Sequence, residues 1–311
     1  MTSFNLQAYL VSRREIVDRA LERHIQSHQE RSQTTWKAMR YALFPGGKRI
    51  RPILTLAAGE LFGAAHKELL PFACAIEMIH TYSLVHDDLP ALDNDDFRRG
   101  APTTHKAFGE GLALLAGDGL LTEAFHLMSS PAAARSAAPK LVIELIHEVS
   151  RAAGTMGLVG GQVLDLQAEN KTVDLATLEY IHVQKTGALI VAALRVGARI
   201  AGAAAADLRR ITRYGEFLGL AFQISDDILD VEEDTGAVPS PDFGHPEKRK
   251  ATYASVVGIV QAKERLRDLV QQAVKQLAPY RKRAEVLEAL AAYVGARALY
   301  TENSTVKEIQ A

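Results

Sequence analysis

Two clusters of aspartates are the residues of this chain best suited to carry chemistry. The first begins at Asp87 and reads DDLPALDNDDF, and the second begins at Asp226 and reads DDILD. Carboxylates this close together repel one another unless a cation lies between them. Oxygen ligands favour a hard ion such as Mg²⁺, which shares its remaining positions with water and substrate phosphates. Because Arg98 and Arg99 follow the first cluster, and a guanidinium matches phosphate oxygens, we interpret the clusters as a metal-bridged diphosphate site.

The second cluster has the spacing of one helix face. Gln223, Asp226, Asp227 and Asp230 lie at positions i, i+3, i+4 and i+7, which project from the same side of a helix. An ordinary solvated face would include lysines that relieve the repulsion, and this face has none. The pattern therefore favours a metal site over an acidic surface.

The first cluster is less regular. Asp87 and Asp93 are six positions apart, which an ideal helix would place on different sides. Pro90 lies between them and cannot donate to the backbone ladder, so a helix that is distorted or ends there could bring both carboxylates to one ion. The alternative is a polar cap at a helix end, which would not need five aspartates in ten residues.

Basic and polar groups elsewhere could complete such a site. The segment GGKRIRP, which contains Lys48 and Arg51, could wrap a phosphate with backbone N–H groups and charge-assisted bonds; a solvated run of charge is the alternative. His80 lies two helical turns before Asp87 on the same face, although a lone histidine in a helix is usually structural. The segments GGQVLD at 160–165 and KT at 185–186 establish nothing alone.

Composition limits the classes of protein that fit. The 311 residues are 48% hydrophobic, enough for a large buried core. The 36 basic and 37 acidic residues argue against attraction to nucleic acid or an anionic membrane. The one cysteine, Cys74, excludes an internal disulfide and is expected to be packed in the core. Residues 186–206 look like a membrane span, but Arg195 and Arg199 interrupt it, so we predict a buried helix in which both arginines have partners. With no secretory signal at the N-terminus, we expect a cytoplasmic protein with no membrane span.

Helical periodicity dominates the chain. An apolar stripe runs through Leu6, Leu10, Val17, Leu21 and Ile25. Long stretches rich in Ala, Leu, Glu and Arg follow, separated by breaks such as those at 44–47 and 160–161. We find no alternating strand pattern, so we predict an all-α fold with ten or more helices in a single domain, 1–311. Residues 235–249 are rich in proline and glycine, and we predict a loop that acts as a lid.

In this order, several motifs resemble those of the trans-isoprenyl diphosphate synthase (trans-prenyltransferase) family: GGKRIRP, IHTYSLVHDDLPALDNDDFRRG, GGQVLDLQ, KTGALI and GLAFQISDDILD. They span residues 46–230, and the first aspartate motif, with two inserted residues, is similar to that of the bacterial farnesyl diphosphate synthase branch. The resemblance implies a helical bundle around a central apolar cavity, and a homodimer. It also implies head-to-tail condensation of isopentenyl diphosphate with dimethylallyl and then geranyl diphosphate, to give farnesyl diphosphate, with three Mg²⁺ ions per site.

The resemblance also implies roles for individual residues. Mg²⁺ would be held by Asp87, Asp93 and Asp226, with Asp88, Asp227 and Asp230 in support. The allylic diphosphate would be held by Arg98, and isopentenyl diphosphate by Lys48, Arg51, His80 and Arg99. The allylic group would face Lys185, Thr186 and Gln223. The released diphosphate can accept the proton, so no protein base is required.

One departure concerns the loop after the second motif. The family usually carries a lysine there, and Ser240 falls at that position in this chain. Loss of the lysine would weaken the binding of the allylic substrate, and Lys248 or Lys250 is a candidate to replace it.

Two residues just before the first aspartate cluster bear on product length. By resemblance, Tyr82, five residues before Asp87, and its neighbour Ser83 limit the product to fifteen carbons. Ideal helical geometry would place Tyr82 about 140° from Asp87, so periodicity alone does not direct it toward the cavity.

Other functions compete with this interpretation. A geranyl or geranylgeranyl diphosphate synthase would share all the motifs. A non-catalytic subunit of a prenyltransferase heteromer would tend to lose aspartates, whereas both clusters here are intact. A class I terpene cyclase shares the metal ligands but would not need a second diphosphate site.

Overall fold

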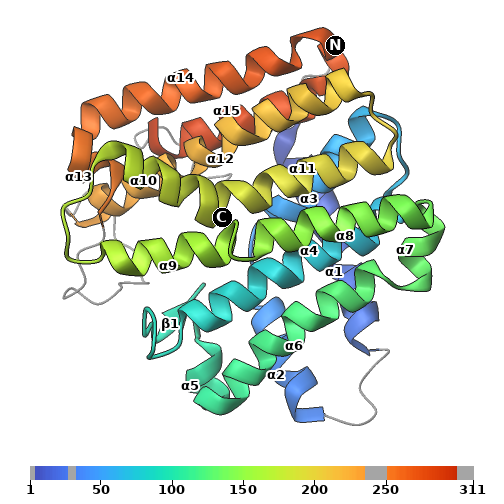
Figure 1. Ribbon diagram of the computed structural model, residues 1–311, viewed down its shortest axis with the longest axis horizontal. Coiled ribbons are helices and arrows are strands. Elements are labelled where there is room, and N and C mark those ends of the chain that lie inside the picture. Colours follow the sequence, from blue (N-terminus) through green and yellow to red (C-terminus); the bar gives the residue numbers. More distant parts are fainter. Residues whose placement is uncertain (1–3, 27–32, 235–250, 300–311) are drawn as a thin grey trace.

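The computed structural model describes residues 4–26, 33–234 and 251–299 and is built almost entirely from helices (Figure 1). The α-helices are α1 (Leu6–Gln26), α2 (Gln33–Leu43), α3 (Ile50–Leu61), α4 (His66–Asp87), α5 (Thr104–Phe108), α6 (Glu110–Met128), α7 (Pro131–Ser136), α8 (Pro139–Ala153), α9 (Leu158–Ala168), α10 (Leu175–His182), α11 (Ala188–Ile200), α12 (Ala205–Asp234), α13 (Tyr253–Val257), α14 (Ile259–Leu277) and α15 (Glu285–Leu299). A π-helical turn, η1 (Val183–Gly187), joins α10 to α11, and a 3₁₀ segment, η2 (Ala278–Ala284), joins α14 to α15. The strands of the described ranges form a two-residue hairpin, β1 (Phe97–Arg98) with β2 (Ala101–Pro102). The predicted all-α fold is confirmed.

The centre of the molecule is formed by α3, α4, α11 and α12, each packed on the next (Figure 1). Helix α3 is apolar on nearly every side, and Ile53, Leu54 and Leu56 are fully buried, as expected of a helix surrounded by others. Close packing of α3 on α11 requires a glycine, because a Cβ on Gly197 would lie 2.1 Å from the carbonyl oxygen of Thr55.

Two predictions about individual helices are confirmed. In α1, Val17, Leu21 and Ile25 are fully buried, so the apolar stripe faces the core. In α11, Arg195 and Arg199 are paired with Glu148 and Glu144 of α8, which explains how two arginines are tolerated in an otherwise apolar helix.

Cys74 is buried as predicted, and burial raises the pKa of its thiol to about 12. None of the helices described here has an apolar stretch sufficient to cross a membrane.

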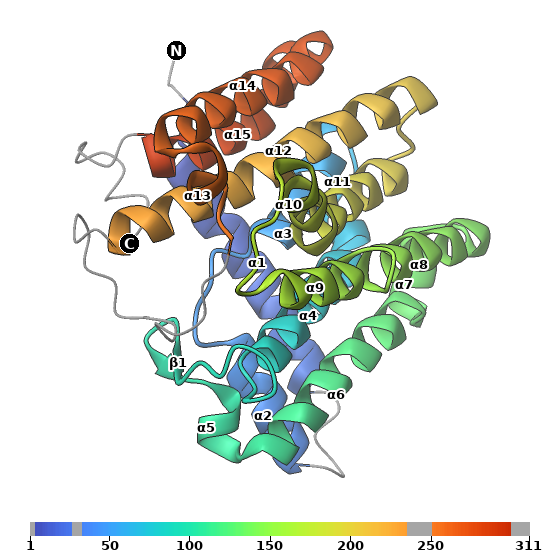
Figure 2. The same ribbon diagram turned by 60° about the vertical axis from the view of Figure 1, so that its left-hand side comes forward.

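The fold brings the two acidic clusters to one end of the bundle. Helices α4 and α12 run in the same direction and finish at the same end, beside the β1–β2 hairpin and α13 (Figures 1 and 2). Helices α3 and α11 separate α4 from α12, so the clusters lie on opposite sides of that end. The predicted lid, residues 235–249, lies outside the described residues. The single domain and its central cavity stay predictions.

Candidate active site

The first acidic cluster lies where α4 ends. The helix stops at Asp87, Asp88 occupies the C-cap, and the chain then turns so that the Asp93 N–H donates to the Asp87 carbonyl oxygen over 2.8 Å. The predicted helix end near Pro90 is confirmed. The turn brings the backbone of Asp93 next to that of Asp87. In a regular helix, residues six positions apart would lie on different sides.

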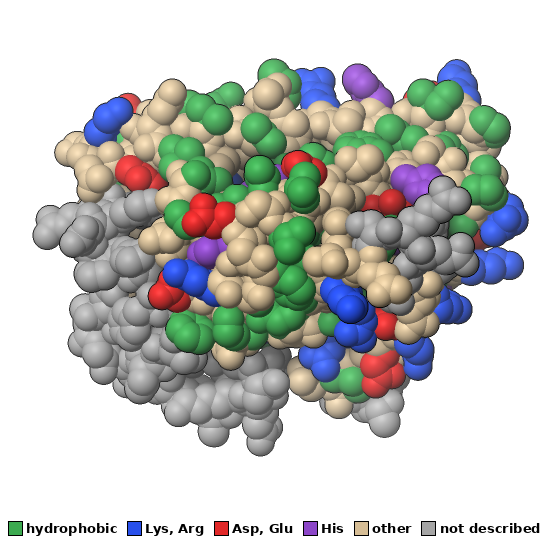
Figure 3. All heavy atoms as spheres, turned by 90° about the horizontal axis from the view of Figure 1, so that it is seen from below, with side chains coloured by type: hydrophobic (Ala, Val, Ile, Leu, Met, Phe, Trp, Pro, Cys, Tyr) green, Lys and Arg blue, Asp and Glu red, His purple; other side chains and the backbone are tan. Residues whose placement is uncertain are grey.

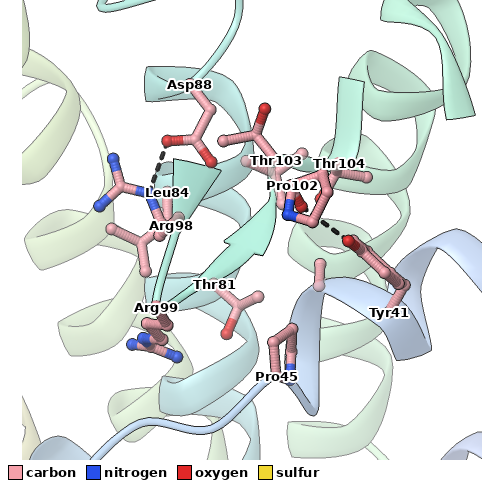
Figure 4. Close-up of a pocket in the computed structure, with 12 residues that line it drawn as sticks. Tyr41, Pro45, Thr81, Leu84, Asp88, Arg98, Arg99, Pro102, Thr103 and Thr104 are labelled. Carbon is pink, nitrogen blue, oxygen red and sulfur yellow. Dashed lines mark hydrogen bonds and ion pairs between the residues drawn. The ribbon is translucent and has the colours of Figure 1, made fainter. Parts of the chain in front are cut away.

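Asp88 is held by an arginine. Asp88 is 3% exposed, and its carboxylate accepts a hydrogen bond of 2.5 Å from Arg98 Nε (Figure 4). Arg98 Nη2 lies 3.1 Å from Asp95. Burial raises the pKa of Asp88 to about 7, opposed by the Arg98 charge. The pair ties the hairpin that carries Arg98 and Arg99 to the end of α4. Asp88 therefore supports the site from behind, while Asp87 and Asp93 remain the candidate ligands on this side.

A small pocket lies behind this pair, lined among others by Tyr41, Thr81, Asp88 and Arg99 (Figure 4). Its volume of about 30 Å³ has room for water but not for a prenyl chain. It is part of the support of the hairpin and not a substrate pocket.

The basic residues predicted to bind a diphosphate gather next to the first cluster. Arg99 Nη1 donates to the Gly46 carbonyl over 2.8 Å, and a Cβ on Gly47, whose φ is +115°, would lie 2.5 Å from the same nitrogen. Arg51 is half-buried, and its Nε is a buried atom with no hydrogen-bond partner among the described residues. Burial, together with Arg51 and Arg99, lowers the pKa of His80 well below its usual value. His80 is therefore neutral at neutral pH.

The run Lys48-Arg49-Ile50-Arg51 divides into two functions. Arg49, with a left-handed φ of +50°, turns into the protein, where its guanidinium lies 2.9 Å from Glu77 and 2.8 Å from Asp18. Lys48 instead lies over the Tyr293 ring, its Nζ 5.6 Å from the centroid. Arg49 thus anchors the loop, and Lys48 and Arg51 are left for an anion.

In the second cluster the three aspartates differ in their surroundings. The Asp227 carboxylate is 5% exposed and accepts hydrogen bonds from the Tyr253 backbone N–H over 2.6 Å and from Gln223 Nε2 over 3.0 Å. Burial raises its pKa to about 6. Asp230 is exposed.

Asp226 lies 2.9 Å from Arg297 of α15. Burial raises the pKa of Asp226, and Arg297, Lys48 and Arg51 oppose the rise. A third of the Asp226 side-chain surface, 33%, stays accessible.

The π-helical turn η1 places Lys185 and Thr186 between α9 and α12. Lys185 Nζ lies 2.6 Å from Asp165, and Thr186 Oγ1 donates to Gln223 Oε1 over 2.9 Å. Gln223 in turn donates to Asp227, so Thr186, Gln223 and Asp227 form one hydrogen-bonded row that leads into the second acidic cluster. Turns of this kind are frequent at functional sites.

The interpretation of residues 160–161 as a break between helices was wrong. Gly160 and Gly161 lie inside α9, and Gly161 is needed for close packing, because a Cβ there would lie 2.3 Å from the Lys185 backbone nitrogen. Gly161 lies where the backbone of α9 packs closely on that of η1. From sequence alone, a glycine needed for such close packing looks the same as a glycine in a turn.

We predict that Gly161→Ala displaces η1 and lowers the free energy of unfolding by about 1–3 kcal/mol through overpacking. The measurement is denaturant unfolding followed by circular dichroism. Gly111→Ala in α6 is the matched control, because a Cβ there meets nothing within 4 Å and helix propensity favours alanine. Equal effects of the two substitutions would contradict the proposed contact.

The donor set suits a hard cation, although protein groups alone do not enclose one. No three His, Cys, Asp or Glu side chains in the described ranges come together as a metal cluster. Mg²⁺ commonly binds one or two carboxylates and takes its other ligands from water and phosphate, so separated acidic walls fit Mg²⁺ shared with a diphosphate. The guanidinium of Arg297 against Asp226 shows that a cation is stable at that carboxylate. The assignment of metal to these residues stays a prediction.

The structure also adds residues that the motifs did not assign. Arg297 and Tyr293 lie on α15, near the C-terminal end of the described chain, and reach the site only through tertiary packing. Asp165 pairs with Lys185, and its place in GGQVLD was the one sequence signal for it. Ser240, Lys248 and Lys250 lie outside the described residues.

Comparison with known proteins agrees with this geometry. A family model described as polyprenyl synthetase matches residues 32–292. The chain is 43% identical over 294 residues to a farnesyl diphosphate synthase of Geobacillus stearothermophilus, with 94% of this chain and 97% of that one covered.

The chain belongs to the polyprenyl synthetase family. Among the members of this family, a geranylgeranyl diphosphate synthase of Cyanophora paradoxa is 44% identical, with 94% of this chain and 97% of that one covered. A crystal structure of an FPP/GFPP synthase from Zymomonas mobilis superposes with a TM-score of 0.84 at 37% identity, covering 94% and 99%. The family resemblance inferred from the motifs is confirmed, and the chain is a prenyltransferase; the different names of these relatives leave the product length open.

Proposed function

We propose that this prenyltransferase is a Mg²⁺-dependent farnesyl diphosphate synthase, which condenses isopentenyl diphosphate with dimethylallyl and then geranyl diphosphate. The observation that carries the proposal is the arrangement of two acidic helix ends on opposite sides of one end of the bundle, with a separate basic group beside the first. The reaction uses two different diphosphates. The two acidic clusters would serve one of them through metal ions, and the basic group would bind the other directly.

The acidic residues would act on the allylic substrate. Bound Mg²⁺ supplies Lewis-acid stabilisation of the negative charge that develops on the departing diphosphate. Asp87 and Asp93 on one side, and Asp226 on the other, would hold that charge in place. Asp88 and Asp227 keep the two walls in position through Arg98 and Tyr253.

The basic group would bind isopentenyl diphosphate. Arg51 has a buried N–H with no partner in the described part of the chain, and such a donor costs free energy unless a ligand accepts from it. Lys48, Arg99 and neutral His80 complete the group. A terpene cyclase would have no use for this second site, which argues for the condensation reaction.

The polar row along η1 would face the allylic cation. Lys185 is paired with Asp165, and the oxygens of Thr186 and Gln223 lie in the row leading to Asp227. Oxygen dipoles of this kind stabilise a developing positive charge without attacking it. The π electrons of the isopentenyl diphosphate double bond form the new C–C bond with the allylic cation, and the released diphosphate takes the proton that the condensed product then loses.

The test is incubation of the protein with isopentenyl and dimethylallyl diphosphate and Mg²⁺, followed by identification of the product alcohol after dephosphorylation. Farnesol supports the proposal. Geraniol or geranylgeraniol identifies the sibling enzymes, of which the geranylgeranyl synthase is favoured by the similarity to the Cyanophora protein. The absence of any condensation product would leave the non-catalytic subunit as the better explanation.

We further propose that the protein is a homodimer. Large apolar side chains are exposed on α6, α8 and α9, which lie together at the front of Figure 1, and on the turn between α8 and α9: Leu114, Leu115, Ile143, Met156, Val159 and Val163. Figure 3, seen from the side where α6 lies, also shows hydrophobic side chains at the surface between groups of charged ones. Exposed apolar groups gathered in this way mark interaction surfaces, and twofold homodimers are the commonest assembly.

We expect the protein at micromolar concentration to sediment with twice the 33.9 kDa mass of the chain. Ile143→Asp should shift it to the monomer, because that side chain is 68% exposed on α8 and a carboxylate at the centre of an apolar interface is desolvated without a partner. Val260→Asp on α14 is the control, since Val260 is 62% exposed on a helix outside this surface. A monomeric wild-type protein would disprove the proposal.

A further inference from the structure

Asp226 is held differently from Asp88 and Asp227, the buried carboxylates of the two clusters. Asp227 accepts from a backbone N–H and an amide, and Asp88 from an arginine that also contacts Asp95. Asp226 contacts Arg297, with 2.9 Å between Nη2 and Oδ1. Arg297 lies close to the end of α15, 71 positions further along the chain than Asp226.

Arg297 has contacts that hold its guanidinium in place, but not all of its N–H groups have acceptors among the described residues. Its guanidinium lies 5.2 Å from the centroid of the Phe222 ring, on the same helix as Asp226. Its Nε is buried and has no hydrogen-bond partner within the described ranges. The side chain is 14% exposed. A structural arginine such as Arg49 uses Nε, Nη1 and Nη2 on three different acceptors, so Arg297 is much less constrained.

The position matters because acidic walls without metal repel one another. A cation beside Asp226 relieves that repulsion in the ligand-free protein. The same cation opposes the arrival of a divalent ion, since it occupies one carboxylate oxygen and adds positive charge close to the ion.

We propose that Arg297 is an internal counter-ion, which neutralises Asp226 in the ligand-free protein and is displaced from Oδ1 when Mg²⁺ binds. The inference rests on the proposed function, because it takes Asp226 as a metal ligand. Metal binding is then coupled to release of Arg297, and with it the end of α15, from Asp226. By reciprocity, Arg297 stabilises the empty site and weakens the affinity of that site for metal.

Three roles for Arg297 predict three different results for Arg297→Gln. A counter-ion predicts that the ligand-free protein melts about 2 °C lower and that the Mg²⁺ concentration at half-saturation falls about fivefold. A purely structural arginine predicts a lower melting temperature with an unchanged half-saturation. An arginine that binds the diphosphate predicts a higher half-saturation.

The experiment is thermal unfolding titrated with MgCl₂ at a fixed concentration of methylenediphosphonate, a non-hydrolysable diphosphate. Arg297→Lys keeps the charge and should give a smaller shift. Arg213→Gln is the matched control, because Arg213 forms an exposed pair with Glu216 on α12, and it should leave the half-saturation unchanged.

A second readout isolates the contact itself. In an Asp226→Asn background, Arg297→Gln should no longer lower the melting temperature of the ligand-free protein, because the ion pair is already lost. If the Mg²⁺ concentration at half-saturation is unchanged or higher in Arg297→Gln, the inference is overturned. The proposed function is kept in that case as long as Mg²⁺ with methylenediphosphonate stabilises the wild-type protein. A wild-type protein that Mg²⁺ with methylenediphosphonate does not stabilise overturns the proposed function, and the inference falls with it.

Discussion

Asp226→Ala is expected to lower kcat for condensation of isopentenyl with dimethylallyl diphosphate by about a thousandfold, the cost of removing one group that stabilises developing charge. Asp226 is a carboxylate of the second wall that pairs with Arg297 and has a third of its side-chain surface, 33%, accessible. Its loss would leave the diphosphate charge stabilised from one side only. The measurement is steady-state turnover at saturating Mg²⁺, with release of labelled product.

The matched control is Glu216→Ala on the same helix, where the carboxylate is 43% exposed and pairs with Arg213. Turnover of this variant should equal that of the wild type, because surface pairs contribute little. Wild-type turnover in Asp226→Ala would overturn the assignment of the second acidic cluster. A fall in both variants would point to disturbance of α12 and not to lost chemistry.

Tyr82→Ala is expected to shift the product from fifteen to twenty or more carbons. Each added five-carbon unit gains about 4 kcal/mol of burial at about 0.8 kcal/mol per CH₂-sized group, so affinity favours longer chains and a steric stop must end them. Tyr82 is 5% exposed, and its ring meets His86 edge to face with 5.7 Å between centroids. The measurement is the chain-length distribution of the product alcohols.

The packing around Tyr82 indicates what the substitution would open. His86 Nε2 lies 3.0 Å from the Leu114 carbonyl of α6, and a Cβ on Gly117 would lie 2.1 Å from the same nitrogen. The tyrosine, the histidine and α6 therefore form one packed wall. Tyr82→Phe keeps the ring and should keep the fifteen-carbon product, and Ser83→Ala should change it less than Tyr82→Ala. An unaltered product from Tyr82→Ala would remove Tyr82 as the stop.

Much of the chemistry could be predicted from the sequence because it depends on local spacing. The i, i+3, i+4 and i+7 pattern from Gln223 to Asp230 needed one helix, and α12 supplies it. Pro90 indicated that α4 ends near the first aspartates, and it ends at Asp87. Helical periodicity predicted the all-α fold, and the paired arginines of α11 were expected from the cost of burying charge.

Tertiary structure decided how side chains with the same charge are used. Lys48, Arg49 and Arg51 look equivalent in sequence, but the left-handed turn at Arg49 directs that side chain to Glu77 and leaves Arg51 with an unpaired N–H among the described residues. Asp88 and Asp227 share their motifs with Asp87 and Asp226, yet Arg98 and the Tyr253 backbone hold them.

Contacts between distant segments could not be predicted from local pattern at all. Arg297 reaches Asp226 from α15, and Gly161 allows α9 to approach η1. The sequence by itself determined which residues could bind metal and diphosphate, since residue type and helical period are local properties. Only the packing of helices decided which carboxylates are buried against protein partners and which stay accessible, because burial and partner choice depend on segments far apart in the chain.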